Sequence, residues 1–162
     1  MKILIVSDNH RYVDDFKKVV EKVAKFDPLD LVIHCGDSEG TEEAIGRIAG
    51  CPLEIVTGNN DYFSALPREK EFMVGRYKVW LVHGHKYFVA VENKTIRDEA
   101  IRRNADIVMY GHTHRPVVDI KPDLIVINPG SLRYPRQEGR RRSFIIMDID
   151  GNGEAHFTIN YL

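Results

Sequence analysis

The chain has 162 residues, 43% of them hydrophobic and 29% charged, which is typical of a soluble globular protein with room for one sizeable core. The formal net charge of −1 excludes a long-range field that would recruit nucleic acid or an anionic membrane. No apolar run is long enough to span a bilayer, and no basic and apolar leader precedes the first predicted strand, so we expect a cytoplasmic protein. The two cysteines, Cys35 and Cys51, form no disulfide framework, which agrees with a reducing compartment.

The first half of the chain alternates between strand and helix patterns. Residues 2–7 form a continuous apolar, β-branched run, which predicts a central strand buried on both faces. From Phe16 to Ala24, apolar residues recur at helical spacing between lysines and acids, which predicts an amphipathic helix. The other elements predicted here are a strand at 31–33, a helix at 41–49 with Thr41 as N-cap and Gly50 as its stop, and a strand at 53–57.

The second half consists mostly of predicted strands. Residues 70–74 and 77–82 flank Gly75 and predict a hairpin, and residues 92–104 form a predicted helix with its apolar side chains on one face. Further strands are predicted at 106–110, 117–120, 124–127, 143–149 and 155–159. The sequence contains no repeat, low-complexity tract or linker, so we expect one α/β domain over residues 1–162.

Five predicted strands end in a loop that carries metal-binding side chains. These side chains are Asp8 and His10, Asp37, Asn59, His83, and His112 with His114. Six of the seven histidines, all except His156, lie at or next to such a strand end. In open α/β sheets the functional crevice lies beyond the carboxyl ends of the strands, where all of these side chains fall. A single His-x-His pair or strand-end aspartate is often only part of a turn, but the repetition at five strand ends favours a metal site.

The mixture of ligand types indicates the kind of ion. Carboxylates, imidazoles and an amide oxygen together suit a divalent ion such as Mn, Fe, Zn or Ni. Seven candidate ligands are too many for one ion and suit two ions that share a carboxylate. Two metals ~3.5–4 Å apart are a common device for in-line displacement at phosphorus, because they polarise the phosphoryl oxygens and generate a bound hydroxide as nucleophile. We therefore expect a metal-dependent phosphoesterase with a dinuclear centre.

The order of the strand-end motifs resembles that of a known family. The motifs are Asp8-x-His10, Gly36-Asp37, Gly58-Asn59, His83-Gly84-His85 and Gly111-His112-Thr113-His114, followed by Asn128-Pro129-Gly130-Ser131. Together they resemble the calcineurin-like metallophosphoesterases, specifically the small single-domain bacterial and archaeal phosphodiesterase branch, over nearly the whole chain. The resemblance implies a two-sheet α/β/β/α sandwich, in which mixed sheets are flanked by helices.

The resemblance also implies a role for each motif residue. Carried over by position, the residues that would hold the first ion are Asp8, His10 and His114. Those that would hold the second are Asn59, His83 and His112, and the residue that would bridge the two ions is Asp37. The residues that we expect to contribute to catalysis are Asp37, Asn59 and His112. The ions expected are two divalent transition metals, Mn first and Ni, Fe or Zn as alternatives. The expected substrate is a small phosphoester, no membrane association is expected, and homo-oligomerisation is left open.

One position departs from the family pattern. Many relatives place a histidine directly after the motif asparagine, where it protonates the leaving group or clamps a phosphate oxygen, but this chain has Asn60. The general acid is therefore unassigned, and we expect phosphodiesters to be favoured over phosphomonoesters. His85 is either a residue that orients a ligand or a plain structural histidine, and both interpretations stay open.

Three further features have plain structural interpretations. We expect Cys35 to be a buried thiol and His34 to be a core or ligand-supporting residue, because both precede Gly36 at a strand end. The arginines from Arg133 to Arg142 are more typical of a solvated face than of a phosphate site, so specific nucleic-acid binding is not expected. The alternative function is a non-catalytic protein-interaction scaffold, since a eukaryotic trafficking subunit shares the implied fold. A scaffold needs no complete metal shell, so the seven ligand positions favour the enzyme.

Overall fold

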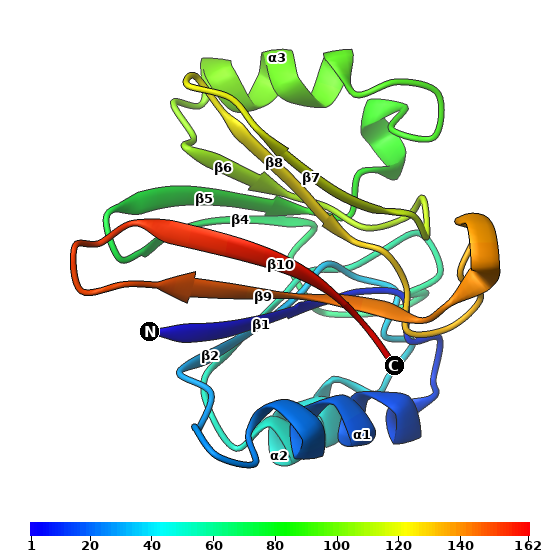
Figure 1. Cartoon of the computed structure of the whole chain (residues 1–162). Coiled ribbons are helices and arrows are strands. Elements are labelled where there is room, and N and C mark those ends of the chain that lie inside the picture. The colour runs from blue at the N-terminus through cyan, green and yellow to red at the C-terminus, as the bar shows by residue number, and fades with distance from the viewer.

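A computed structural model describes all residues, 1–162, and contains two five-stranded sheets that face each other (Figure 1). Helices α1 (Val13–Val23) and α2 (Glu42–Ala49) cover the outer face of the first sheet, and α3 (Lys94–Arg102) covers the outer face of the second. None of these helices combines the length and apolarity needed to cross a bilayer. The predicted α/β/β/α sandwich of mixed sheets is therefore confirmed.

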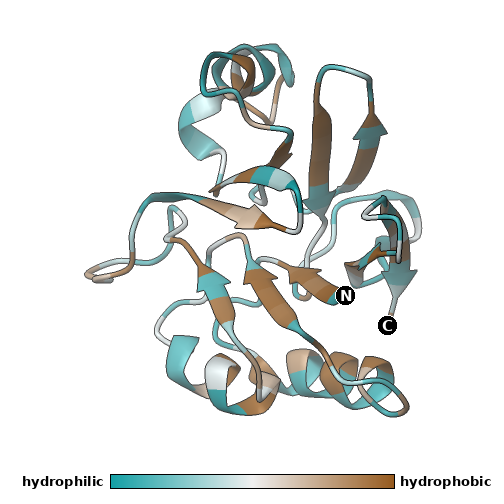
Figure 2. Cartoon of the chain, turned by 90° about the vertical axis from the view of Figure 1, so that its left-hand side faces the viewer, coloured by the Kyte–Doolittle hydropathy of each residue, from teal (hydrophilic) through white to brown (hydrophobic).

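The first sheet is built around β1, as its continuous apolar sequence requires. Its strands are β1 (Lys2–Val6), β2 (Leu31–His34), β3 (Leu53–Ile55), β9 (Ser143–Ile149) and β10 (Ala155–Tyr161), in the order β10-β9-β1-β2-β3. Strands β1, β2 and β3 run parallel, and β9 and β10 are antiparallel neighbours. Alternate side chains of β1 point to opposite faces: Ile3 and Ile5 join the core between the sheets, whereas Leu4 and Val6 pack with α1 and α2. Figure 2 shows these strands as hydrophobic segments between the helices and the second sheet.

The second sheet repeats this arrangement with hairpins at its edges. Its strands are β4 (Glu69–Val74), β5 (Tyr77–Val82), β6 (Ile107–Met109), β7 (Pro116–Ile120) and β8 (Ile125–Pro129), in the order β4-β5-β6-β8-β7. Strands β5, β6 and β8 are parallel, and β4 and β7 pair antiparallel with β5 and β8. Leu81 and Met109 face the core between the sheets, while Trp80 and Val108 pack beneath α3. The predicted turn at Gly75 is confirmed, and its φ of +57° is one that glycine adopts readily.

Some predicted boundaries and contacts were wrong. Helix α3 begins at Lys94 rather than at residue 92, and two short 3₁₀ helices, η1 (His85–Tyr87) and η2 (Glu138–Arg140), occupy loops for which no element was predicted. Thr41 precedes α2 as predicted, but its hydroxyl makes no cap hydrogen bond. Instead the hydroxyl donates to the Ser38 carbonyl at 2.7 Å and accepts from Asn9 Nδ2 at 3.1 Å. This threonine therefore joins the loops that follow β1 and β2.

The loops that carry the predicted ligands meet at one end of the sandwich. The Asp8 amide donates to the Gly36 carbonyl at 3.0 Å, which joins the loops after β1 and β2. The Gly111 amide donates to the His83 carbonyl at 3.1 Å, which joins the loops after β6 and β5. Parallel strands thus deliver residues that are far apart in sequence to one place between the sheets.

Candidate metal centre

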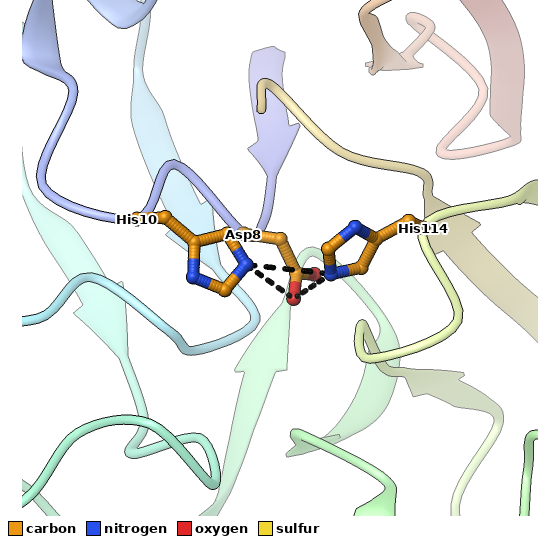
Figure 3. A group of neighbouring side chains, drawn as sticks. All are labelled: Asp8, His10 and His114. Carbon is orange, nitrogen blue, oxygen red and sulfur yellow. Dashed lines mark hydrogen bonds and ion pairs between the residues drawn. The ribbon is translucent and has the colours of Figure 1, made fainter. Parts of the chain in front are cut away.

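Asp8, His10 and His114 converge from the loops after β1 and β6 (Figure 3). His114 Nε2 lies 3.0 Å from Asp8 Oδ1, and His10 Nε2 lies 3.8 Å from the same oxygen. The two imidazole nitrogens are 3.4 Å apart. One carboxylate oxygen and two ring nitrogens therefore face a common point.

A second group lies beside the first and shares Asp8 with it. It consists of Asp8, Asp37 and His83. Asp37 Oδ2 is 3.5 Å from His83 Nε2 and 4.0 Å from His10 Nε2, so this oxygen lies between histidines of the two groups. His83 Nε2 also lies 3.1 Å from Asn59 Oδ1. The structure thus places six of the seven predicted ligands, Asn59 included, around one small volume.

His112 and His114 diverge although they are two residues apart. His114 reaches Asp8 and His10, whereas the ring of His112 has its centroid 5.3 Å from the ring of His83. The His112 amide donates to Asp8 Oδ2 at 3.2 Å. Both residues have positive φ, +65° and +57°, so the backbone between them is not extended. The pair therefore contributes one side chain to each side of the cluster.

Positive φ values recur at the predicted ligands. Asp8, His10 and Asp37 have φ of +55°, +45° and +58°, in addition to the two histidines of the β6 loop. Such values are uncommon for residues other than glycine, and they concentrate at functional sites because surrounding contacts must hold them. Five of the twelve non-glycine residues with positive φ are thus proposed ligands.

Two glycines allow the loops to approach closely. A Cβ on Gly58 would lie 2.0 Å from Asp37 Oδ1 and 2.6 Å from the Asp37 amide nitrogen. A Cβ on Gly111 would lie 2.1 Å from Ser7 Oγ and 2.8 Å from Asp8 Oδ2. Asp37 and Asp8 can therefore keep these positions only because the neighbouring loop has a glycine at the point of contact.

The two aspartates are buried acids that stay ionised. Asp8 is 0% and Asp37 1% exposed. Burial raises the pKa of each carboxyl, but histidine contacts outweigh it, so the pKa of both aspartates is below the usual value. The same carboxylates overcome the effect of burial on His83 and raise its pKa to about 9. Asp8 Oδ1 has no hydrogen-bond partner although it is buried, so these residues fit a bound cation.

The outer nitrogens of three imidazoles are tied to acceptors. His10 Nδ1 donates to Glu39 Oε1 at 2.7 Å. His83 Nδ1 donates to the Cys35 carbonyl and His114 Nδ1 to the Tyr134 carbonyl, each at 2.8 Å. Because these partners only accept, Nδ1 carries a proton in each ring and Nε2 is the nitrogen that faces the cluster, where it can bind a metal when it is deprotonated. Glu39 was missed by the sequence analysis, although it follows Asp37 within the same loop.

Asp61 was also missed, and it joins two ligand loops. Its Oδ2 accepts from the amides of Asp37 at 2.8 Å and Gly58 at 2.7 Å, and its Oδ1 accepts from the Glu39 amide at 2.5 Å. The signal available in the sequence was the acid that ends the Gly58-Asn59-Asn60-Asp61 loop. Its function here is to hold the loops after β2 and β3 together.

The Asn128–Ser131 motif braces the other two loops. Ser131 Oγ donates to the Asp8 carbonyl at 3.0 Å, and Asn128 Nδ2 donates to the Gly111 carbonyl at 2.8 Å. Both side chains are fully buried. The motif therefore supports the backbone that carries Asp8 and His112 and does not itself offer ligands.

His34 and Cys35 have the structural roles expected for them. Both are fully buried. His34 Nε2 donates to Asn9 Oδ1 at 2.9 Å, and burial lowers the pKa of His34 to about 4, so it is neutral. Burial raises the pKa of the Cys35 thiol, which is thus a poor ligand.

His85 and the arginine segment lie outside the ligand groups. The His85 ring centroid is 5.5 Å from that of His83, and burial together with the nearby His83 lowers its pKa to about 4. Within the segment, Arg142 and Arg133 lie 3.0 and 3.9 Å from Asp15 carboxylate oxygens. Two of the arginines are therefore partly neutralised by an acid of α1.

Comparisons with known proteins agree with the fold. The model of the calcineurin-like phosphoesterase superfamily domain matches residues 1–152. The chain is 29% identical over 152 residues to the probable metallophosphoesterase YsnB of Bacillus subtilis, which covers 94% of this chain and 86% of that protein. It is 29% identical over 147 residues to a phosphodiesterase of Methanocaldococcus jannaschii, and this match covers 80% of this chain and 83% of that protein. The fold is similar to that of Vps29 from Entamoeba histolytica, solved with Zn²⁺, with a TM-score of 0.78 over 99% of each chain at 18% identity.

Proposed function

Because the chain belongs to the calcineurin-like phosphoesterase superfamily, we propose that it is a phosphodiesterase with a dinuclear metal centre. The observation that carries this proposal is Asp8 Oδ1, an ionised and buried oxygen with no hydrogen-bond partner, beside the Nε2 atoms of His10 and His114. Leaving such a group unpaired is costly, and a divalent cation would satisfy it.

The proposed division of ligands keeps the first side-chain group and differs from the second, because it assigns Asp8 to one ion only and makes Asp37 the shared residue. Asp8, His10 and His114 would hold one ion. Asn59, His83 and His112 would hold the other, and Asp37 would bridge them, which is supported by the position of Asp37 Oδ2 between His10 and His83. When bound, such ions polarise the phosphoryl oxygens and lower the pKa of the water that attacks phosphorus.

The protein's own residues would orient this centre. The Glu39 carboxylate and the Cys35 and Tyr134 carbonyls fix three imidazoles with Nε2 toward the cluster. Asn60 holds the Asp37 carboxylate through its backbone and side-chain amides. The side-chain amide of Asn60 cannot protonate a leaving group. Substrates whose leaving group departs without protonation are therefore favoured. This argument supports small diesters as substrates, as does the name of the Methanocaldococcus relative.

The test compares bis(p-nitrophenyl) phosphate with p-nitrophenyl phosphate. The protein is stripped with chelator, dialysed, and reloaded with Mn, Ni, Zn or Mg. We expect no turnover without metal, and a stronger effect of transition metals than of Mg, because His10, His83, His112 and His114 supply nitrogen ligands. Full activity in excess chelator after prolonged dialysis would exclude a metal-dependent reaction.

The alternative is a protein-interaction scaffold on the same fold, which the likeness to Vps29 keeps under consideration. Metal binding alone does not discriminate, since that Vps29 structure contains Zn²⁺. Turnover does: a scaffold would bind ions without hydrolysing either ester. Two bound ions with no turnover of any aryl diester would favour the scaffold.

A further inference from the structure

One hollow of about 350 Å³ opens directly beside the candidate metal centre. Its lining includes Asn59 and His85, together with Phe63, Arg68 and Lys86. The one acid in the lining, Asp61, accepts hydrogen bonds from the amides of three residues of the ligand loops. A second hollow of about 350 Å³ also contains two arginines, Arg115 and Arg136, but none of the seven proposed ligands lines it. The hollow beside Asn59 is therefore the one that a substrate held at the metal centre would enter.

Two cations in this hollow have no partner within the protein. Arg68 and Lys86 are exposed, and neither makes an ion pair or a side-chain hydrogen bond. The nearest acid in sequence, Glu69, pairs with Arg103 at 3.2 Å instead. Both cations also line the adjoining hollow of about 260 Å³. Unpaired cations that line the same cavity favour an anionic occupant.

The aromatic residue of the hollow is equally unpartnered. Phe63 is fully exposed, and its φ is +62°. A bulky side chain in this conformation is an outlier, and here neither burial nor packing offsets its cost. Phe63 lines both this hollow and a neighbouring one beside Asn60, so it lies between the two hollows. An exposed ring at such a position is suited to stack on a planar group.

We propose that this hollow binds a nucleotide arm of the substrate, with the base stacked on Phe63 and a second phosphate held by Arg68 and Lys86. The inference rests on the proposed function, in which the first phosphate lies at the metal centre. It adds the substrate class: a nucleotide diester that carries a further phosphate.

The test measures binding rather than turnover, so that it stands apart from the test of the proposed function. Dissociation constants of three ligands for the manganese-loaded protein are measured by titration calorimetry: adenosine 3′,5′-bisphosphate, adenosine 5′-monophosphate and ribose 5-phosphate. We expect the bisphosphate to bind about tenfold more tightly than the monophosphate, because charge-assisted contacts to phosphate are worth this much. The monophosphate should in turn bind about tenfold more tightly than ribose 5-phosphate, which has no base to stack.

Variants assign each preference to its residue. Lys86→Met and Arg68→Met should each reduce the advantage of the bisphosphate, and Phe63→Ala should remove the advantage of adenosine over ribose. Lys25→Met and Phe26→Ala are matched controls, because Lys25 is exposed and the Phe26 ring is 90% exposed, both after α1. Equal binding of the three ligands, or equal losses in the control variants, would overturn the proposal. If the native protein shows these binding preferences but hydrolyses neither aryl ester, the proposed function is overturned and the proposed nucleotide-binding site still stands.

Discussion

Asn60 holds both oxygens of the Asp37 carboxylate. Its backbone amide donates to Oδ1 at 2.8 Å, and its side-chain amide donates to Oδ2 at 2.6 Å. Both contacts contribute to lowering the pKa of Asp37. Asn60, which departs from the family pattern, therefore contacts the carboxylate that is proposed to bridge the two ions. Substitution of Asn60 tests the function of this position.

We expect Asn60→His to shift the ratio of kcat/KM toward phosphomonoesters. A histidine at this position offers a proton to the leaving group, and general acid catalysis is typically worth about 10²–10⁴-fold. The comparison requires a diester and a monoester with the same leaving group, because kcat/KM reports transition-state stabilisation relative to free substrate. Metal content should be unchanged, and Asn60→Ala, which offers no proton, serves as the control. An unchanged ratio in a fully metallated Asn60→His protein would mean that this side chain does not face the leaving group.

Removal of charge at the two aspartates should affect metal binding differently. As the proposed bridge, Asp37 would serve both ions, so Asp37→Asn should weaken both sites. Asp8→Asn should mainly weaken the site shared with His10 and His114, which lie 3.8 and 3.0 Å from its Oδ1. Metal counting on the purified variants decides the matter. Near-full occupancy by two ions in Asp37→Asn would rule out the bridge, and loss of both in Asp8→Asn alone would transfer that role to Asp8.

Glu39→Ala should lower the affinity for one ion about 10–100-fold, as is typical when the partner of a metal-binding histidine is removed. Glu39 is the only carboxylate that accepts from a ligand Nδ1, at 2.7 Å from His10. Glu39→Gln should retain part of the affinity, since an amide oxygen can still accept. Arg11→Met is the control, because Arg11 contacts Glu39 at 2.8 Å but is 74% exposed and touches no ligand. Competition with a chelating indicator measures the affinity, and unchanged binding in Glu39→Ala would show that His10 is oriented without it.

The sequence could place the candidate ligands at one end of the sheets, because each lies in a loop that follows a buried strand. An apolar run, a glycine and a polar side chain are all local features, so Asp37 and His83 could be placed at the sheet end before the fold was known. The residues that were missed act across the fold. Glu39 and Asp61 make their contacts with loops 29 and 24 residues away, at His10 and Asp37. The spacing of residues along the sequence does not predict such a contact, because the contact depends on how the strands that carry the two loops pair in the sheet.

The same distinction explains the incorrect role for Thr41. A threonine before a helix with acids in its first turn is a common N-cap pattern. Here the hydroxyl is engaged by Ser38 and Asn9 of two ligand loops. Local propensity identified the position, and tertiary contacts determined what the side chain does there.

Metal affinity should rise with pH up to about 9. Burial alone would lower the pKa of His83, but Asp37 and Asp8 raise it to about 9 in the metal-free protein. Below that pH the imidazole is protonated, so an incoming ion must displace a proton. The apparent dissociation constant should therefore fall about tenfold per pH unit from 7 toward 9 and then level off. Calorimetry in buffers of different ionisation enthalpy would measure the protons released, and an affinity independent of pH over this range would contradict the assigned protonation state.

Gly58→Ala should destabilise the protein and disturb the metal centre together. The added Cβ would lie 2.0 Å from Asp37 Oδ1 and 2.6 Å from the Asp37 amide nitrogen, so backbone as well as side chain must move. Overpacking of this kind typically costs about 1–3 kcal/mol, which corresponds to a fall in Tm on the order of 5 °C for a chain of this size. Gly151→Ala is the matched control, because a Cβ there meets nothing within 4 Å, and its stability should change by less than about 0.5 kcal/mol. Thermal unfolding and metal counting on both variants test the point. If Gly58→Ala unfolds at the temperature of Gly151→Ala and binds two ions, the loops after β2 and β3 do not need this close approach to position Asp37.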